Sequence, residues 1–168
     1  MKIGLLSDTH GHMDDAILKY FSDRDEIWHA GDIGTEEIIF KLKAICPLRA
    51  VSGNIDGQNI RSLVPPLLSF SCEGIKVLII HIGGYPGNYF PEARKLIKEY
   101  SPDLFICGHS HILKVMRDEQ FQLLHMNPGA AGIHGFHKMR TLLRFDINEG
   151  KITDLEAIEL GLRGKISS

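Results

Sequence analysis

The 168-residue sequence predicts a single mixed α/β domain. The chain opens with short apolar runs that alternate with amphipathic segments, in the order strand, helix, strand, helix, strand, which is typical of a parallel sheet covered by helices. Beyond Pro65-Pro66, pairs of strands separated by turn residues dominate. No repeat, low-complexity tract or linker divides the chain, so we expect one domain over residues 1–160 and a frayed tail over residues 161–168.

The opening half supplies three apolar runs and two periodic segments. The predicted strands cover Lys2 to Leu6, Glu26 to Ala30 and Leu48 to Val51, and the predicted helices cover Asp14 to Phe21 and Thr35 to Ala44. Asp14 and Asp15 fall in the first turn of the first helix, where the helix dipole favours acidic side chains. Thr35 is a suitable N-cap for the second helix.

Hairpin signals and one helix organise the rest of the chain. The predicted pairs are Leu67 to Ser71 with Lys76 to Ile80, Lys114 to Arg117 with Gln122 to Met126, and Thr141 to Ile147 with Ile152 to Ala157. A buried strand is expected over Leu104 to Cys107, and a helix is expected from Pro91 to about Tyr100 because proline suits the first helical position.

Composition excludes several classes of partner. The net charge of −2 comes from 19 basic and 21 acidic residues that are scattered along the chain, so neither long nucleic acid nor a membrane surface is an expected partner. Cys46, Cys72 and Cys107 form no Cys-x-x-Cys pair, which argues against a disulfide framework and a thiolate zinc site. The first residues lack the apolar core of a signal peptide, so we expect a cytoplasmic protein, and the sequence leaves its oligomeric state open.

Polar side chains that can bind metal follow nearly every predicted buried strand. In parallel sheets, ligands bind beyond the carboxyl ends of the strands, so these residues are expected to converge. They are Asp8, His10, Asp32, Asn54, His81, His109 and His111. The donors are oxygen and imidazole without sulfur, which suits manganese, iron, nickel, cobalt or zinc rather than calcium. Their number exceeds the needs of one ion and indicates two ions that share a carboxylate.

Each of these features also has a structural explanation when it is taken alone. Asp32 after a glycine is typical of a turn cap, and Gly53-Asn54 is typical of a left-handed turn. His81 in isolation suits a hydrogen-bonded core histidine, and a lone Asp8-x-His10 has little specificity. The ordered recurrence at successive strand ends favours the metal interpretation.

At this point the sequence resembles a known family. The segments Asp8-Thr-His10, Gly31-Asp32, Gly53-Asn54-Ile-Asp56, His81 and Gly108-His-Ser-His111 resemble, in order and spacing, the signature of the calcineurin-like metallophosphoesterases. Asn127-Pro-Gly129 resembles the compact bacterial and archaeal phosphodiesterase branch. The resemblance implies a four-layer α/β/β/α sandwich, in which two facing mixed β-sheets are flanked by helices.

The resemblance also implies a ligand set and a reaction. Asp8, His10, Asp32 and His111 would hold one metal, and Asp32 would bridge to a second metal held with the residues Asn54, His81 and His109. Two divalent cations, manganese by preference, would then hold a hydroxide that attacks a small phosphodiester. The alternatives are a phosphomonoesterase, a dinucleotide polyphosphate hydrolase and a non-catalytic scaffold that resembles a subunit of the retromer coat.

The sequence departs from the family pattern beside the predicted centre. Many members have a histidine after the asparagine, where it assists the leaving group, whereas this chain has Ile55. His12, His134 and His137 are candidates to replace it, and we favour His134 because it lies between glycines. Asn54 and His134 are therefore the candidate catalytic residues beyond the metal ligands. The natural ester, the native metal and the leaving-group acid stay open.

Overall fold

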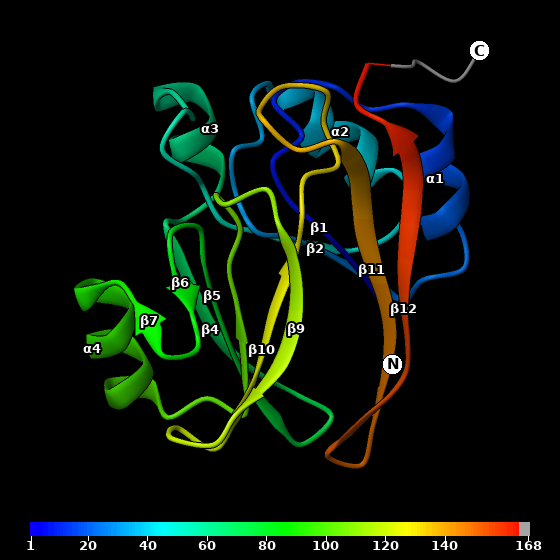
Figure 1. The fold of residues 1–168 in the computed structure, drawn as a ribbon. Helices are drawn as coiled ribbons and strands as arrows, with labels where there is room; N and C mark the ends of the chain where they lie inside the picture. The colour runs from blue at the N-terminus through cyan, green and yellow to red at the C-terminus, as the bar shows by residue number, and fades with distance from the viewer. Residues whose placement is uncertain (165–168) are drawn as a thin grey trace.

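A computed structural model describes residues 1–164 as two five-stranded β-sheets with helices on their outer faces (Figure 1). The first sheet has the strand order β12 (Lys151–Leu162), β11 (Met139–Asn148), β1 (Lys2–Leu6), β2 (Glu26–His29) and β3 (Leu48–Ala50). The second has the order β4 (Leu67–Cys72), β5 (Ile75–Ile80), β8 (Leu104–Ile106), β10 (Leu123–Pro128) and β9 (Leu113–Asp118). The helices are α1 (Asp15–Phe21), α2 (Glu36–Lys43), α3 (Gln58–Leu63) and α4 (Pro91–Tyr100).

Three neighbouring strands of each sheet run parallel, and the other strands join the sheet through antiparallel pairs. Strands β1, β2 and β3 pair in parallel, as do β5, β8 and β10. The predicted hairpins are confirmed as the antiparallel pairs β4–β5, β9–β10 and β11–β12. Because these three strands are parallel in each sheet, their carboxyl ends lie at one edge of that sheet.

Three apolar clusters hold the layers together. Between the sheets, Trp28 packs edge to face against Phe70 and Phe145, with ring centroids 5.2 and 5.7 Å apart. Outside the first sheet, α1 and α2 bury side chains that include Ile17 and Ile39. Outside the second sheet, α4 buries its apolar face, and the cluster there contains Ala93, Ile97, Leu78 and Phe105. The four-layer α/β/β/α order expected from the sequence is confirmed.

Several local expectations need correction. The sequence did not predict α3, because a helix of six residues with one buried side chain, Ile60, leaves almost no periodic signal. It also missed the short hairpin of β6 (Gly84–Tyr85) and β7 (Asn88–Tyr89). Asp14 is the N-cap of α1, and its carboxylate accepts a hydrogen bond from the N–H of Ile17 at 3.4 Å. Thr35 is at the N-cap of α2 but its side chain makes no capping bond.

The predicted frayed tail begins too early. Strand β12 continues to Leu162, where it pairs with Met139 of β11, and Gly161 pairs with Arg140. Backbone pairing to a ten-residue strand keeps this segment ordered although most of its side chains are exposed. The remainder of the expected tail, residues 165–168, lies outside the described residues. Within residues 1–164, every helix is too short or too polar to cross a membrane.

Candidate metal centre

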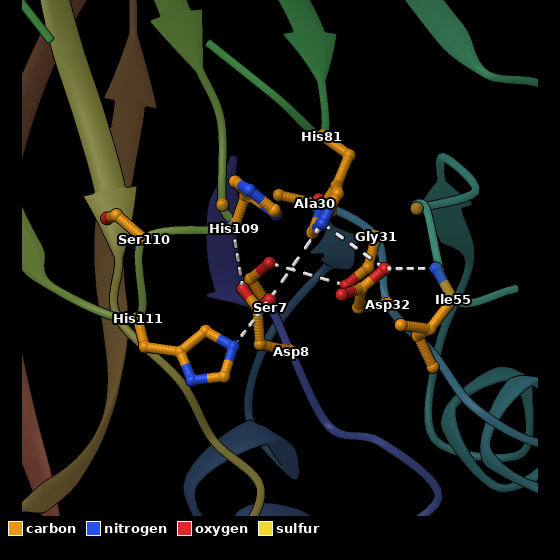
Figure 2. Close-up of polar contacts among 12 residues, drawn as sticks. Ser7, Asp8, Ala30, Gly31, Asp32, Ile55, His81, His109, Ser110 and His111 are labelled. Atoms are coloured by element: carbon orange, nitrogen blue, oxygen red, sulfur yellow. Dashed lines mark hydrogen bonds and ion pairs between the residues drawn. The ribbon is translucent and has the colours of Figure 1, made fainter. Parts of the chain in front are cut away.

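The loops that leave the carboxyl ends of both sheets meet at one place, and six predicted ligands lie there in two groups. Figure 2 labels all of them except His10. The groups are Asp8, His10 and His111, and Asp32, His81 and His109. Within each group the three ligand atoms lie within 4.8 Å of one another. Residues from both sheets contribute, since Asp8, His10 and Asp32 follow β1 and β2, whereas the other three histidines follow β5 and β8.

Carboxylate oxygens link the two groups. In the first, Nε2 of His111 lies 3.1 Å from Oδ1 of Asp8, and in the second, Nε2 of His81 lies 3.2 Å from Oδ1 of Asp32. Oδ2 of Asp32 also lies 3.6 Å from Nε2 of His10 in the first group. Asp32 therefore stands between the groups, which is the position the sequence assigned to a shared carboxylate.

Hydrogen bonds beyond the strand ends fix the loops. The backbone N–H groups of Asp8, His10 and Gly11 donate to carbonyls of the segment 31–33 at 2.8 to 3.0 Å, which continues the pairing of β1 with β2. The N–H of His109 donates to Oδ2 of Asp8 at 3.1 Å and ties the second sheet to the first. The N–H of Gly132 donates to the carbonyl of Asp8 at 3.0 Å and adds a second tie between the loops of the two sheets.

The backbone of the centre has unusual torsion angles. Five of the six clustered residues have left-handed φ values although none is glycine: 53° at Asp8, 47° at His10, 52° at Asp32, 68° at His109 and 59° at His111. Such values are uncommon for residues with a side chain, and they concentrate at functional sites. Gly53 and Gly108 make room beside them, because a Cβ at either position would collide with Asp32 or with Ser7 and Asp8.

Two of the histidines have a ring nitrogen whose hydrogen is already committed. The Nδ1–H of His81 donates to the carbonyl of Ala30 at 2.7 Å, so the lone pair of Nε2 faces Asp32. His137 donates from Nε2 to the carbonyl of Gly132 at 3.0 Å, so its Nδ1 accepts the Nδ1–H of His111 at 3.1 Å. The Nε2 lone pair of His111 therefore faces Asp8. These tautomers follow from the hydrogen-bond partners.

Acceptor atoms thus face one another across the centre. A nitrogen lone pair opposite a carboxylate oxygen at hydrogen-bond distance is stable only with a proton or a cation between them. Three atoms there are buried without a hydrogen-bond partner: Oδ1 of Asp8 and Nε2 of His81, which belong to these contacts, and Nε2 of His10. Leaving such atoms unpaired is costly. The nitrogen and oxygen donor set fits divalent transition metals.

Contacts between the carboxylates and the histidines favour the charged forms of both. Burial opposes ionisation of Asp8, but the hydrogen bond with His111 and the field of His81 outweigh it and lower the pKa of Asp8. Burial likewise opposes ionisation of Asp32, and its bond with His81 lowers its pKa below the ordinary value. Burial opposes protonation of His81, yet Asp32 and Asp8 raise the pKa of that histidine. Both carboxylates are therefore anionic near neutral pH.

Two supporting residues escaped the sequence analysis as functional groups. Asp56 is buried, and its carboxylate accepts the N–H groups of Ile33, Gly34 and Gly53 at 3.1, 2.8 and 2.7 Å. It ties the loop that carries Asp32 to the loop that carries Asn54. The fully buried His29 bonds to Thr9 at 3.0 Å, and burial lowers the pKa of His29 to about 4, although Asp56 opposes the shift.

The remaining predicted residues lie around the centre. Asn54 is exposed and lines a cavity together with His81. His134 is exposed, and its ring centroid lies 6.2 Å from that of His10. His137 contacts His111, whereas Nε2 of His12 lies 3.6 Å from Asp14. Of the three candidates for leaving-group assistance, His134 is the one whose ring faces a metal-site histidine without a hydrogen bond to it.

Comparison with known proteins identifies the family. The calcineurin-like phosphoesterase superfamily domain matches residues 1–150. The chain belongs to this superfamily. It is 31% identical over 167 residues to the "Probable metallophosphoesterase" of Methanothermobacter thermautotrophicus, covering 96% of this chain and 94% of that protein. It is 26% identical over 145 residues to a phosphodiesterase of Methanocaldococcus jannaschii, covering 77% of this chain and 83% of that protein.

Two solved structures share the architecture of this chain. A structure of an archaeal phosphodiesterase superposes with a TM-score of 0.77 at 23% identity, covering 95% of this chain and all 100% of that one. Vps29 of Entamoeba histolytica, complexed with Zn²⁺, superposes with a TM-score of 0.71 at 16% identity, covering 95% and 99%. At these identities the two structures show a common fold.

Proposed function

We propose that this superfamily member is a phosphodiesterase that hydrolyses small phosphodiesters at a centre holding two divalent cations. The observation that carries the proposal is the pair of adjoining donor groups in which nitrogen lone pairs face carboxylate oxygens. Membership of the phosphoesterase superfamily and the sequence likeness to a phosphodiesterase of Methanocaldococcus jannaschii support the reaction class.

Each clustered residue has a role in this proposal. Asp8, His10 and His111 would hold the first cation, and His81 and His109 would hold the second. Asn54 would complete the second set, and Asp32, which faces both groups, would serve both cations. Manganese is the preferred metal, with iron, nickel, cobalt and zinc as alternatives. When bound, the cations lower the pKa of a coordinated water towards about 7 and stabilise the charge that develops on the phosphate. Two carboxylates against two such cations leave a charge of about +2, which attracts an anionic ester.

Protonation of the leaving group falls to His134 in this proposal. Ile55 occupies the position after Asn54, and its hydrocarbon side chain has no proton to give to a leaving group. Its backbone N–H donates to Oδ1 of Asp32 at 3.1 Å. His134 lies next to His10 on the loop between β10 and β11 and is open to solvent, so it can exchange protons with water. Histidine is the side chain that most often serves in general acid–base catalysis.

Two other functions remain as alternatives. A phosphomonoesterase or dinucleotide polyphosphate hydrolase would use the same centre on a different ester. A binding scaffold without turnover is the second alternative, because Vps29 shares the fold. That Vps29 structure is a complex with Zn²⁺, so a bound metal alone does not separate an enzyme from a scaffold. Turnover is the discriminating measurement.

The test compares a diester with its monoester on the same preparation. We expect manganese-loaded protein to hydrolyse bis(p-nitrophenyl) phosphate faster than p-nitrophenyl phosphate, and chelation to abolish both rates. Asp32→Asn should lower the content of both metals together, because Asp32 faces both groups. Turnover that survives chelation, or full metal stoichiometry in Asp32→Asn, contradicts the two-metal proposal. A faster monoester would favour the phosphomonoesterase alternative.

A further inference from the structure

A cavity of about 460 Å³ opens beside the candidate metal centre. It reaches the centre through Gly53, Asn54 and His81, which form part of its lining. Its other wall comes from β4 with the segment before it, from the end of β5 and from α4. A ligand bound at the centre therefore has open space on this side.

The far wall of the cavity is apolar. The side chains that form it are Pro66, Leu67, Ile80, Ile82 and Leu96. Ile82 follows directly after His81 and is 40% exposed, and Ile55, on the other side of Asn54, is 46% exposed. Aliphatic side chains are exposed here beside a centre of carboxylates and imidazoles. Covering them with an apolar group removes apolar surface from water and so stabilises the complex.

The rim of the cavity carries two opposite charges, those of Arg61 and Glu92. Nε of Arg61 donates to the carbonyl of Asp56 at 2.6 Å, and Nη2 donates to the carbonyl of Gly53 at 3.2 Å. Two bonds to loop backbone hold the guanidinium at the cavity, and Glu92 of α4 lies at the same rim. The cavity therefore pairs a polar entrance with a hydrocarbon wall, as ligand sites commonly do.

Given the phosphodiesterase activity proposed above, we infer that this cavity binds an apolar or aromatic substituent of the phosphate ester. Phosphate at the metal centre places its ester substituents within reach of Gly53 and His81, and the cavity extends from those residues to Leu96. A phosphate group alone makes no contact with the aliphatic wall, whereas an aryl ring occupies part of the volume and covers that wall. The enzyme therefore selects esters with an aryl or similarly apolar group over methyl esters.

The test measures binding of two phosphonates by isothermal titration calorimetry on manganese-loaded protein. Methylphosphonate and phenylphosphonate carry the same anionic head, and their phosphorus–carbon bonds resist hydrolysis, so the measurement does not depend on turnover. We expect phenylphosphonate to bind about tenfold more tightly, which corresponds to roughly 55 Å² of additional apolar surface removed from water.

Two variants probe opposite parts of the wall. Leu96→Ser on α4 and Ile82→Ser on the loop after β5 should each reduce the preference for phenylphosphonate to about twofold. Leu155→Ser is the matched control, because Leu155 is 41% exposed on the edge strand β12 and should leave the preference unchanged. Thermal unfolding of each variant verifies that it is folded.

The outcomes separate this inference from the proposed function. Equal affinity for the two phosphonates, with turnover of bis(p-nitrophenyl) phosphate by the same preparation, overturns the cavity assignment and leaves the phosphodiesterase intact. A phenyl preference that persists in both wall variants also overturns it, because the ring then binds elsewhere. Absence of both turnover and phosphonate binding overturns the proposed function itself. A second copy covering the cavity would give a dimer in light scattering without a phenyl preference, which overturns the inference as well.

Discussion

Replacement of Asp56 by alanine should destabilise the protein strongly although Asp56 is not among the proposed metal ligands. Its carboxylate accepts three backbone N–H groups, from Ile33, Gly34 and Gly53, in a buried site. Hydrogen bonds to a charged acceptor are worth about 1.5–3 kcal/mol each, and the buried donors lose all three at once. Relaxation and entry of water reduce the sum, so we expect a loss of about 3–5 kcal/mol, as for other broken buried charge networks.

Asp56→Asn refines the expectation. Oδ2 of Asp56 accepts from Ile33 and Gly53, and Oδ1 accepts from Gly34. An asparagine that keeps the two bonds at one oxygen turns its amide N–H₂ towards the N–H of Gly34, so two donors oppose each other. The loss should be smaller than for alanine and still exceed about 1 kcal/mol.

The assay is urea unfolding of the metal-free protein followed by circular dichroism, so that bound metal does not contribute. The control is Asp154→Asn, the same chemical change at an exposed position, which should alter the free energy of unfolding by less than about 0.5 kcal/mol. A loss below about 1 kcal/mol for Asp56→Ala would refute the role of this carboxylate in holding the two loops together.

Three further expectations concern the surroundings of the centre. His137→Ala should weaken metal binding by about 10- to 100-fold in calorimetric titrations, because His137 fixes the tautomer of His111; unchanged affinity contradicts this. His134→Ala should slow hydrolysis of alkyl aryl diesters more as the leaving group becomes poorer, and an equal effect across leaving groups argues against an acid role. The pKa of Asp14 is lowered because the bond to buried Arg140 outweighs the opposing effect of burial. That pair therefore stabilises the fold above the unfolded pKa of 3.8 and loses its contribution as pH falls through the lower native pKa. Asp14→Asn should cost about 3 kcal/mol in urea unfolding at pH 7, and a deficit that does not shrink below pH 3 contradicts the linkage.

The sequence predicts the clustered ligands for a topological reason, whereas the four layers were implied by the family resemblance. Parallel strands such as β1 and β2 bring their carboxyl ends to one edge whatever their side chains, so Asp8 and Asp32 converge once the strands are recognised. The opposite sheet contributes His81 in the same way after β5. The apolar pattern of each strand and the polar residues that follow it are local signals, and both can be recognised from the sequence alone.

The supporting residues depend on tertiary contacts that leave no local signal. Asp56 bonds to Ile33 and Gly34, which lie more than 20 residues earlier, so only the approach of two loops reveals its role. The sequence favours His134 over His137 only through its flanking glycines, and the structure separates the two because His137 donates to the carbonyl of Gly132. The edge strand β12 was underestimated because exposed side chains obscure a strand that backbone pairing maintains.

Backbone support of this kind has a consequence for how the centre binds metal. The left-handed residues Asp8, His10 and Asp32 are held by main-chain bonds between the two loops, and Asp56 holds the second loop in turn. The ligand positions are therefore set before any cation arrives, and binding need not repay the entropy of ordering those loops. Pre-positioning leaves His81 and Asp32 facing each other as two acceptors. A proton relieves this opposition below the raised pKa of His81, and a cation relieves it above that pKa. Because the cation replaces a proton at each such contact, metal affinity should rise with pH. Because the cation binds the folded protein, metal loading should also stabilise the fold by mass action.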